Sequence, residues 1–227
     1  MRRRRCFTLA AVLFSVALLV CFHQSLLTCA LQRHVVEQSA SHVDRVVVYG
    51  GEGRFDLAAE GIRAGTIDGI LLLEDKATRP VRLGILPSTI AAARQSLTSR
   101  GIADESITDI RGTQRNQREA VLQLGDWLNG NPGVRVQFLC RRLESAAWRA
   151  EFDADLDASV ANRIYVRGLP DRSYDEACWW RSRSGIRAVA VAYVGSLYSV
   201  LGDGEEVRRT AWDPDAFADA LRTERPQ

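Results

Sequence analysis

The sequence predicts an α/β fold, with an open, mostly parallel sheet of about five strands covered by helices on both faces and preceded by one N-terminal transmembrane helix. Short apolar, β-branched runs end in glycine or polar turns, and they alternate with segments whose apolar residues recur at helical spacing. These two observations predict the sheet and its helices. The transmembrane helix is predicted by a third, an uncharged apolar run directly after four arginines.

The expected strands and helices alternate between residues 44 and 201. Strands that alternate with helices are typical of a parallel sheet buried on both faces, so this layout is Rossmann-like. We expect strands at residues 44–49, 69–74, 106–110, 134–139 and 163–167, and helices at residues 56–64, 88–100, 116–128, 144–152 and 174–201, the last bent near Ser184 and Gly185.

The chain length favours one domain, because the residues left after the membrane segment suffice for one sizeable core. Residues 1–34 form an arginine-rich stub and membrane anchor in this interpretation, and residues 35–43 form a linker. The Rossmann-like domain then covers residues 44–201, and residues 202–227 are a peripheral appendage.

The N-terminal apolar run covers residues 6–22 and carries no charge, and the apolar stretch 26–31 extends it to a length that suits a tilted bilayer span. The arginines before it place the N-terminus in the cytoplasm and the domain outside, in a single-pass protein of the cell (inner) membrane. A cleaved signal peptide is the alternative, with a small-residue site around Cys29. We favour the uncleaved anchor, so the first predicted partner is the membrane, through residues 6–31.

The charge of the domain argues against a nucleic-acid partner. Five arginines precede the first acidic residue, and the remainder holds 25 basic and 28 acidic side chains, a formal charge of −3. Nucleic-acid binding requires a basic surface.

The histidines are His23, His34 and His42, all within or just after the N-terminal segment, so we expect none in the folded domain. That expectation excludes serine and cysteine nucleophiles activated by histidine, histidine acid–base catalysis and histidine-ligated zinc. The cysteines show no CxxC spacing, and we predict no metal site. Cys140 and Cys178 either form a disulfide in an exported domain or lie buried as small apolar side chains, and we favour the second.

Candidate ligand-binding residues follow the predicted strands, because ligands of open parallel sheets bind outside the carboxyl ends of the strands. Gly50 and Gly51 form a turn before Arg54, where backbone N–H groups and a guanidinium can hold an anion. A simple strand-to-helix turn explains the same residues. The third glycine of a dinucleotide fingerprint and the P-loop motif are both absent, so no cofactor can be named.

Three further turns hold the other candidates. Glu74 ends the second strand and is either a base or cation ligand or a solvated charge. Thr113 and Asn116 precede the third helix, where either can cap the helix or lie beside a ligand. At the end of the fourth strand, Cys140, Arg141 and Arg142 either form a site with an activated thiol or a bound anion, or are a buried cysteine beside solvated arginines.

Trp179 and Trp180 are expected on a helix that covers the sheet or lies at a membrane interface, with one indole buried and the other partly exposed.

The order of elements resembles that of the bacterial SanA/YdcF/ElyC-like family of membrane-anchored envelope proteins. The residues that carry the resemblance are Asp44 to Gly51 with Arg54 and Ala58, Arg100 to Ile102, Glu119 with Ala120, and Trp179 to Ser182. The chain departs from the family at Glu74, Asp75 and Lys76, which replace Ser-Gly-Gly, at Asn116, which replaces threonine, and near Leu143, where the family has histidine.

This resemblance implies a Rossmann-like domain in the cell envelope that binds a small anionic or lipid-linked ligand, with a role in envelope biogenesis or barrier function. The departures imply a divergent site. Two alternatives remain open: an enzyme on a phosphate-containing or nucleotide-like substrate that works without histidine, and a non-catalytic scaffold or assembly factor.

Overall fold

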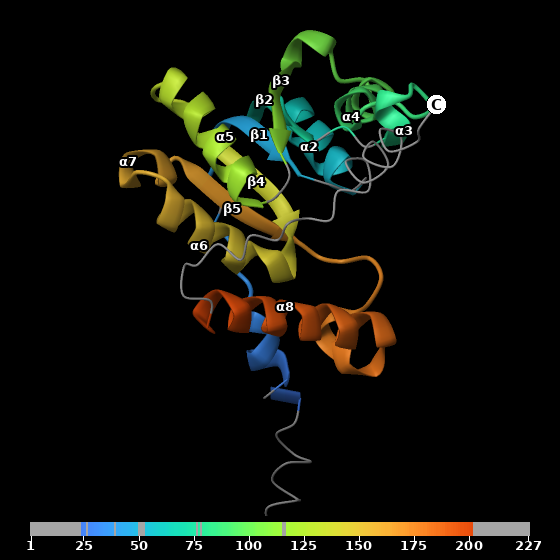
Figure 1. The fold of residues 1–227 in the computed structure, drawn as a ribbon, viewed down its shortest axis with the longest axis vertical. Coiled ribbons are helices and arrows are strands. Elements are labelled where there is room, and N and C mark those ends of the chain that lie inside the picture. Colours follow the sequence, from blue (N-terminus) through green and yellow to red (C-terminus); the bar gives the residue numbers. More distant parts are fainter. Residues whose placement is uncertain are drawn as a thin grey trace, which may run out of the picture.

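The computed structural model describes residues 24, 25, 27–38, 40–49, 53–75, 77, 79–114 and 117–201. Its centre is one five-stranded sheet in which every pair of neighbours is parallel, in the order β3-β2-β1-β4-β5 (Figure 1). The predicted α/β fold with an open parallel sheet is therefore confirmed. The strands are β1 (Val43–Val48), β2 (Ile67–Asp75), β3 (Ile107–Gln114), β4 (Val136–Arg141) and β5 (Ile164–Leu169).

The strand order contains a topological switch point between β1 and β4. From β1 the chain winds outward through β2 to β3, and it then returns across β1 to β4 and continues to β5. Val47 pairs with Leu71 of β2 on one side and with Phe138 of β4 on the other, so β1 is central. In open α/β sheets the crevice at the carboxyl end of such a switch point is where ligands bind.

One face of the sheet is covered by α2 (Gly53–Arg63) and α4 (Thr89–Thr98). Side chains alternate between the faces of a strand, so every second residue of the central strands faces these helices. The buried residues of this layer are Val43, Val46, Val48, Ala58, Ala59, Ile67, Ile70, Leu72, Leu97, Ile102, Ile107 and Leu139.

The other face is covered by α5 (Gln117–Gly130), α6 (Ser145–Asp155) and the single turn α7 (Ala158–Ala161). An aromatic cluster fills its centre, in which the rings of Phe138 and Trp148 lie 4.6 Å apart and those of Phe138 and Phe152 lie 5.2 Å apart. All three side chains are at most 2% exposed. Burying each one stabilises the fold by about 1.5–3 kcal/mol. Helices therefore cover both faces of the sheet, as predicted.

The predicted helix at residues 174–201 is instead two elements, the 3-10 helix η3 (Glu176–Arg181) and α8 (Arg183–Leu201). Ser182 separates them in an extended conformation, and its Oγ accepts a hydrogen bond from the Gly185 backbone N–H at 3.0 Å. A Cβ on Gly185 would lie 2.3 Å from the Trp179 carbonyl oxygen, so only glycine permits this close approach. The break occurs at a serine cap, slightly earlier than the predicted bend.

Four short elements were not predicted: α3 (Arg79–Arg82), η1 (Asp104–Ser106), η2 (Arg142–Glu144) and α7 (Ala158–Ala161). Each is a single turn of three or four residues, too short to show helical periodicity in the sequence.

A third layer lies beyond the sheet, where η3 and α8 pack against the first described residues of the chain (Figure 1). Its buried residues are Leu31, Leu143, Trp179 and Val189. Residues predicted as a linker are also held to the sheet. The Gln38 backbone N–H donates to the Val166 carbonyl at 2.8 Å, and the backbones of Glu37 and Arg167 pair in an isolated antiparallel β-bridge.

Within the part of the chain that the structure describes, no helix has the length and apolar character needed to cross a bilayer. Of the predicted membrane segment, residues 6–22 lie outside the described residues, as does the C-terminal appendage at residues 202–227. Residues 27–31, which were predicted to extend the span, instead pack against η3 and α8 in the third layer.

Candidate functional site

The carboxyl ends of the strands meet at one edge of the sheet, and most of the described candidate residues lie there. Arg141 at the end of β4 pairs with Leu169 of β5, and the Tyr49 backbone N–H donates to the Leu139 carbonyl at 3.4 Å. Tyr49, which follows β1, therefore lies at the same edge as Arg141. This is the carboxyl edge of the switch point between β1 and β4.

Arg54 is the most buried charged residue at this edge. It lies in the first turn of α2, where the chain leaves β1, and only 9% of it is exposed. Burial lowers the pKa of its guanidinium, and the negative charges of Glu144 and Asp171 oppose this while Arg141 adds to it. Side chains from β1, β4 and β5 loops thus act on one another across the switch point.

Arg141 lies at the open side of this group. Its side chain is 66% exposed, and its Nη1 is 3.5 Å from Oε1 of Glu144. Asp171 follows β5, and hydrogen bonds from Ser173, together with the nearby Arg141 and Arg54, lower the pKa of its carboxyl. The Asp171 carboxylate is therefore ionised at neutral pH.

A third arginine reaches the same place from the loop after β5. The Arg172 guanidinium carbon lies 3.3 Å from the position that a Cβ on Gly53 would occupy, so it covers the amino end of α2. Its Nη2 is 3.7 Å from Oδ2 of Asp56, and most of the side chain is exposed. We name Arg54, Arg141 and Arg172 the arginine edge.

Cys140 lies close enough to Arg54 for their charges to act on one another, but of the two alternatives for this residue the activated thiol is wrong. Its side chain is fully buried in the layer under α5 and α6, on the same face of β4 as Phe138. Burial raises the pKa of this thiol to about 12, so at neutral pH it is protonated. It packs as a small apolar side chain, as the alternative interpretation predicted.

Arg142 has a structural partner in place of a ligand. Its Nη1 is 2.9 Å from Oε2 of Glu176, and its Nη2 is 3.9 Å from Oε2 of Glu37. Glu176 belongs to η3, so this ion pair joins the end of β4 to the third layer. The ion pair with Glu176 was not predicted, because the sequence cannot show that Glu176 packs against Arg142.

The remaining candidates occupy the same edge at greater distance or lie outside the described residues. Glu74 is half-buried at the end of β2, beside β1. Thr113 belongs to the end of β3, three strands from β4, which is about 14 Å at ordinary strand spacing. Gly50, Gly51 and Asn116 are outside the described residues.

Sequence reasoning missed Glu144, Asp171 and Arg172. Asp171 and Arg172 follow β5 as Arg54 follows β1, and the same edge rule would have selected them. What the sequence lacks is the strand order, which alone shows that β5 adjoins β4 at the switch point.

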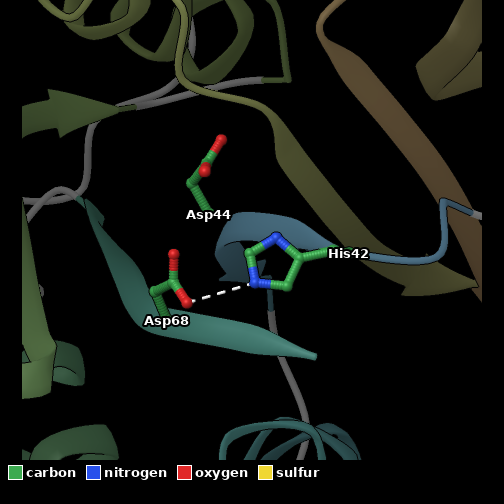
Figure 2. Close-up of side chains that lie close together, drawn as sticks. All are labelled: His42, Asp44 and Asp68. Atoms are coloured by element: carbon green, nitrogen blue, oxygen red, sulfur yellow. Dashed lines mark ion pairs between the residues drawn. The ribbon is translucent and has the colours of Figure 1, made fainter. Parts of the chain in front are cut away.

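Two histidines lie in the folded body, which corrects the expectation that it holds none. His42 approaches the amino ends of the strands, and its Nε2 is 3.2 Å from Oδ1 of Asp68 (Figure 2). His34 is 8% exposed beneath α8, where its ring lies edge-on to Tyr193 at 4.5 Å. Neither lies at the arginine edge, and burial lowers the pKa of His34.

His42, Asp44 and Asp68 are the one group among the described residues whose ligand atoms lie close enough for a shared cation, within 4.8 Å of one another (Figure 2). The Asp44 carboxylate already accepts a hydrogen bond from the Arg135 backbone N–H at 2.6 Å. The three side chains are half-buried or exposed at the end of the sheet opposite the arginine edge. Their contacts close the amino ends of β1 and β2 against the loop before β4.

The tryptophan pair follows the prediction. Trp179 is buried in the third layer, and its indole N–H donates to the Leu27 carbonyl at 3.2 Å. Trp180 is half-buried, with the two ring centroids 6.0 Å apart. The described cysteines, Cys29, Cys140 and Cys178, are free thiols.

Searches against protein-family models, curated proteins and solved structures found no match for this chain.

Proposed function

We propose that this chain is a membrane-anchored envelope protein of the SanA/YdcF/ElyC-like kind, and that its arginine edge binds a small anionic or lipid-linked ligand. The observation that carries the proposal is Arg54, a 9%-exposed guanidinium at the amino end of α2 and at the switch point between β1 and β4. A buried cation is costly to maintain, so its placement in the usual ligand crevice of this architecture favours a binding role.

The chemistry of the edge suits a phosphate or carboxylate group. A guanidinium offers several N–H donors in a fixed plane and binds either group in a bidentate manner. The amino end of a helix adds free backbone N–H groups and a partial positive charge. Arg141, at the end of β4, acts electrostatically on Arg54, and Arg172, after β5, lies beside Gly53, so all three guanidinium groups lie near the amino end of α2.

Binding is favoured over catalysis by the groups at the edge. The Cys140 thiol, with a pKa of about 12, is no nucleophile at neutral pH. The lowered pKa of the Asp171 carboxyl keeps it ionised at neutral pH, which excludes it as a general acid. His34 and His42 lie away from the arginine edge. An enzyme at this site would depend on Glu144 or Asp171 as a base, with arginine stabilising the transition state.

The membrane location rests on the sequence: an uncharged run at residues 6–22 that follows four arginines. By the positive-inside rule this orientation leaves the arginine edge on the extracytoplasmic side of the inner membrane. Anionic groups on this side include phosphate-bearing lipid headgroups and free phosphate compounds, which share the chemistry that the arginine edge recognises.

Thermal unfolding of the full chain in neutral detergent micelles tests the binding site. The probes are inorganic phosphate and pyrophosphate, and phosphatidic acid compared with phosphatidylcholine in the micelle. A ligand at one hundred times its Kd stabilises the folded state by about 2.7 kcal/mol, which raises the melting temperature of a domain this size by about 5–10 °C. A shift with phosphatidic acid alone would identify the lipid as the source of the phosphate group.

The variant Arg54→Met keeps the apolar stem of the side chain and should abolish the shift. Arg141→Met, at an exposed position, should reduce it without changing the melting temperature of the unliganded protein. Arg118→Met on α5 is the matched control, because Arg118 is also exposed and ion-paired, at 3.2 Å to Asp155, but lies away from the switch point. Equal shifts in all four proteins would refute the site, and turnover of pyrophosphate would favour the enzyme.

A further inference from the structure

The outward side of α8 is apolar over most of its length. Its buried or half-buried stripe runs through Gly185, Val189, Ala192 and Ser196, at the three- and four-residue spacing of a helix face. The opposite side exposes large apolar side chains to solvent. These are Ile186 (50% exposed), Val191 (64%), Val194 (56%) and Leu197 (57%).

The charges of α8 differ from those of an ordinary surface helix. Between Arg183 and Leu201 there is no acidic residue, and the charged side chains are Arg183 and Arg187, both exposed. Surface helices of soluble domains carry polar and charged residues on the side away from the core. Apolar side chains gathered on one exposed surface are typical of a region that another molecule or a membrane covers.

α8 is tied to residues 27–34, which follow the uncharged run 6–22 and include the predicted extension 26–31. The Tyr193 hydroxyl donates to the Ala30 carbonyl at 3.0 Å, and the Trp179 indole N–H donates to the Leu27 carbonyl at 3.2 Å. The Ser196 hydroxyl lies 3.3 Å from Nδ1 of His34. Figure 1 shows α8 lying across this first described segment, at the end of the molecule away from the sheet.

This attachment limits the distance between α8 and the end of the apolar run. Leu27 lies five positions after Phe22, and a chain spans at most about 3.5 Å per position, so the two lie within about 17 Å in any conformation. In a helix the separation would be about 8 Å. If residues 6–22 span the bilayer, α8 lies at the level of the lipid headgroups.

We propose that the exposed apolar side of α8 lies in the headgroup layer of the phospholipid bilayer, with the helix axis along the membrane plane. Ile186, Val191, Val194 and Leu197 enter the boundary between headgroups and acyl chains, and Arg183 and Arg187 bind lipid phosphates. This surface rests on the membrane anchor of the proposed function but adds a second contact with lipid, and it fixes the domain's orientation.

Two other occupants would leave different signatures. Residues 202–227, which follow α8 directly, and a second copy of the chain are the alternatives. The bilayer is favoured because α8 is held by residues 27–34, which follow the run 6–22, and because Arg183 and Arg187, on a helix without acidic residues, match anionic phosphates.

Fluorescence quenching by spin-labelled lipids tests the proposal on the full chain in lipid nanodiscs. Bimane is attached at Val194→Cys in a background with Cys29→Ser and Cys178→Ser, and at Leu122→Cys on α5, which is also exposed, as the control. The background protein without an added cysteine measures the fluorescence from label at the remaining cysteines, and this fluorescence is subtracted. Lipids that carry the doxyl group near the headgroup should quench the label at position 194 at least threefold more than the label at position 122.

Equal quenching at the two positions would overturn the proposal. If the fluorescence at position 194 is not quenched by the doxyl lipid but changes when the chain is ended after Leu201, the surface is covered by residues 202–227. If it changes instead with the number of chains per nanodisc, the surface is covered by a second copy. Either result overturns the lipid contact.

Carbonate extraction of the same labelled proteins separates this proposal from the anchor itself. A chain that stays in the membrane while position 194 is unquenched refutes the α8 contact alone. A chain that is released by carbonate refutes the anchor, whereas the phosphate-induced thermal shift reports on the arginine edge independently of both.

Discussion

Alkylation of the native protein by iodoacetamide tests whether the thiol at the end of β4 is a reactive group. Burial raises the pKa of Cys140 from an ordinary 9.0 to about 12. At pH 8 about one ordinary thiol in ten is ionised, against about one in ten thousand for Cys140, and only the thiolate reacts. Cys140 should therefore react at least a thousandfold more slowly than the exposed Cys29, even before its full burial limits access.

The rates are followed by mass spectrometry of peptides after digestion, with the protein in native buffer and in concentrated urea. In urea Cys140 and Cys29 should react at similar rates, which controls for differences in local sequence. Alkylation of Cys140 in native buffer within tenfold of the rate of Cys29 would show that the thiol is accessible and ionised. The placement of Cys140 in the core, and the argument against a cysteine nucleophile, would then be wrong.

The same pKa predicts a loss of stability at alkaline pH. The folded protein holds the Cys140 proton more tightly than the unfolded chain does, and this difference stabilises the folded state. The stabilisation is fully present below pH 9 and is lost as the pH rises from 9 to about 12. About 1.4 kcal/mol is lost by pH 10. Urea unfolding at pH 8 and pH 10 should show this loss in the wild-type protein and not in Cys140→Ala; an identical pH dependence in both would contradict it.

The ion pair between Arg142 and Glu176 is half-buried, so breaking it should destabilise the fold. Arg142→Met leaves the Glu176 carboxylate without this partner and should lower the free energy of unfolding by about 3 kcal/mol. Adding Glu176→Gln to Arg142→Met should restore part of that loss. Denaturant unfolding of the single and double variants measures this, and additive losses would contradict it. Ser182→Ala removes the cap of α8 and should cost about 1 kcal/mol, whereas Ser99→Ala, after the end of α4, should be near neutral in the same assay. A reporter enzyme fused after Gln227 should be active only outside the cytoplasm, and cytoplasmic activity would contradict the proposed orientation.

The sheet was predictable because its signals are local. A buried parallel strand must be apolar on both faces, and runs such as residues 69–74 satisfy this without knowledge of the neighbours. The long C-terminal helix was also predictable, but its start was not. Whether Ser182 caps a new helix depends on the contact between Gly185 and the Trp179 carbonyl, which only the folded chain reveals.

The sequence predicted which edge of the sheet holds the candidate site, but not which side chains point toward it. Arg54 and Arg141 were selected because residues after parallel strands share one edge, and the structure brings their charges together. Cys140 was selected by the same rule, but its side chain points into the core. Residues two apart on a strand face the same side, and Phe138 is a core residue. The histidines were misjudged for another reason: residues 34–42 pack against the fold, although their polar sequence is typical of a linker.

The arginine edge and the third layer adjoin one another, and this bears on which anion the site receives. Tyr174 packs against the buried residues of the third layer, and the charges of Asp171 and Arg141 both act on it, while burial and the neighbouring carboxylates raise its pKa to about 12. The ion pair of Arg142 with Glu176 joins the end of β4 to η3. A ligand bound at Arg141 would therefore lie on the side of the domain that carries α8. If α8 lies in the headgroup layer, an anionic group on a lipid reaches this edge without leaving the membrane, whereas a soluble anion must enter between the domain and the bilayer. The geometry thus favours the lipid-linked ligand, and the comparison of phosphatidic acid with inorganic phosphate decides between the two.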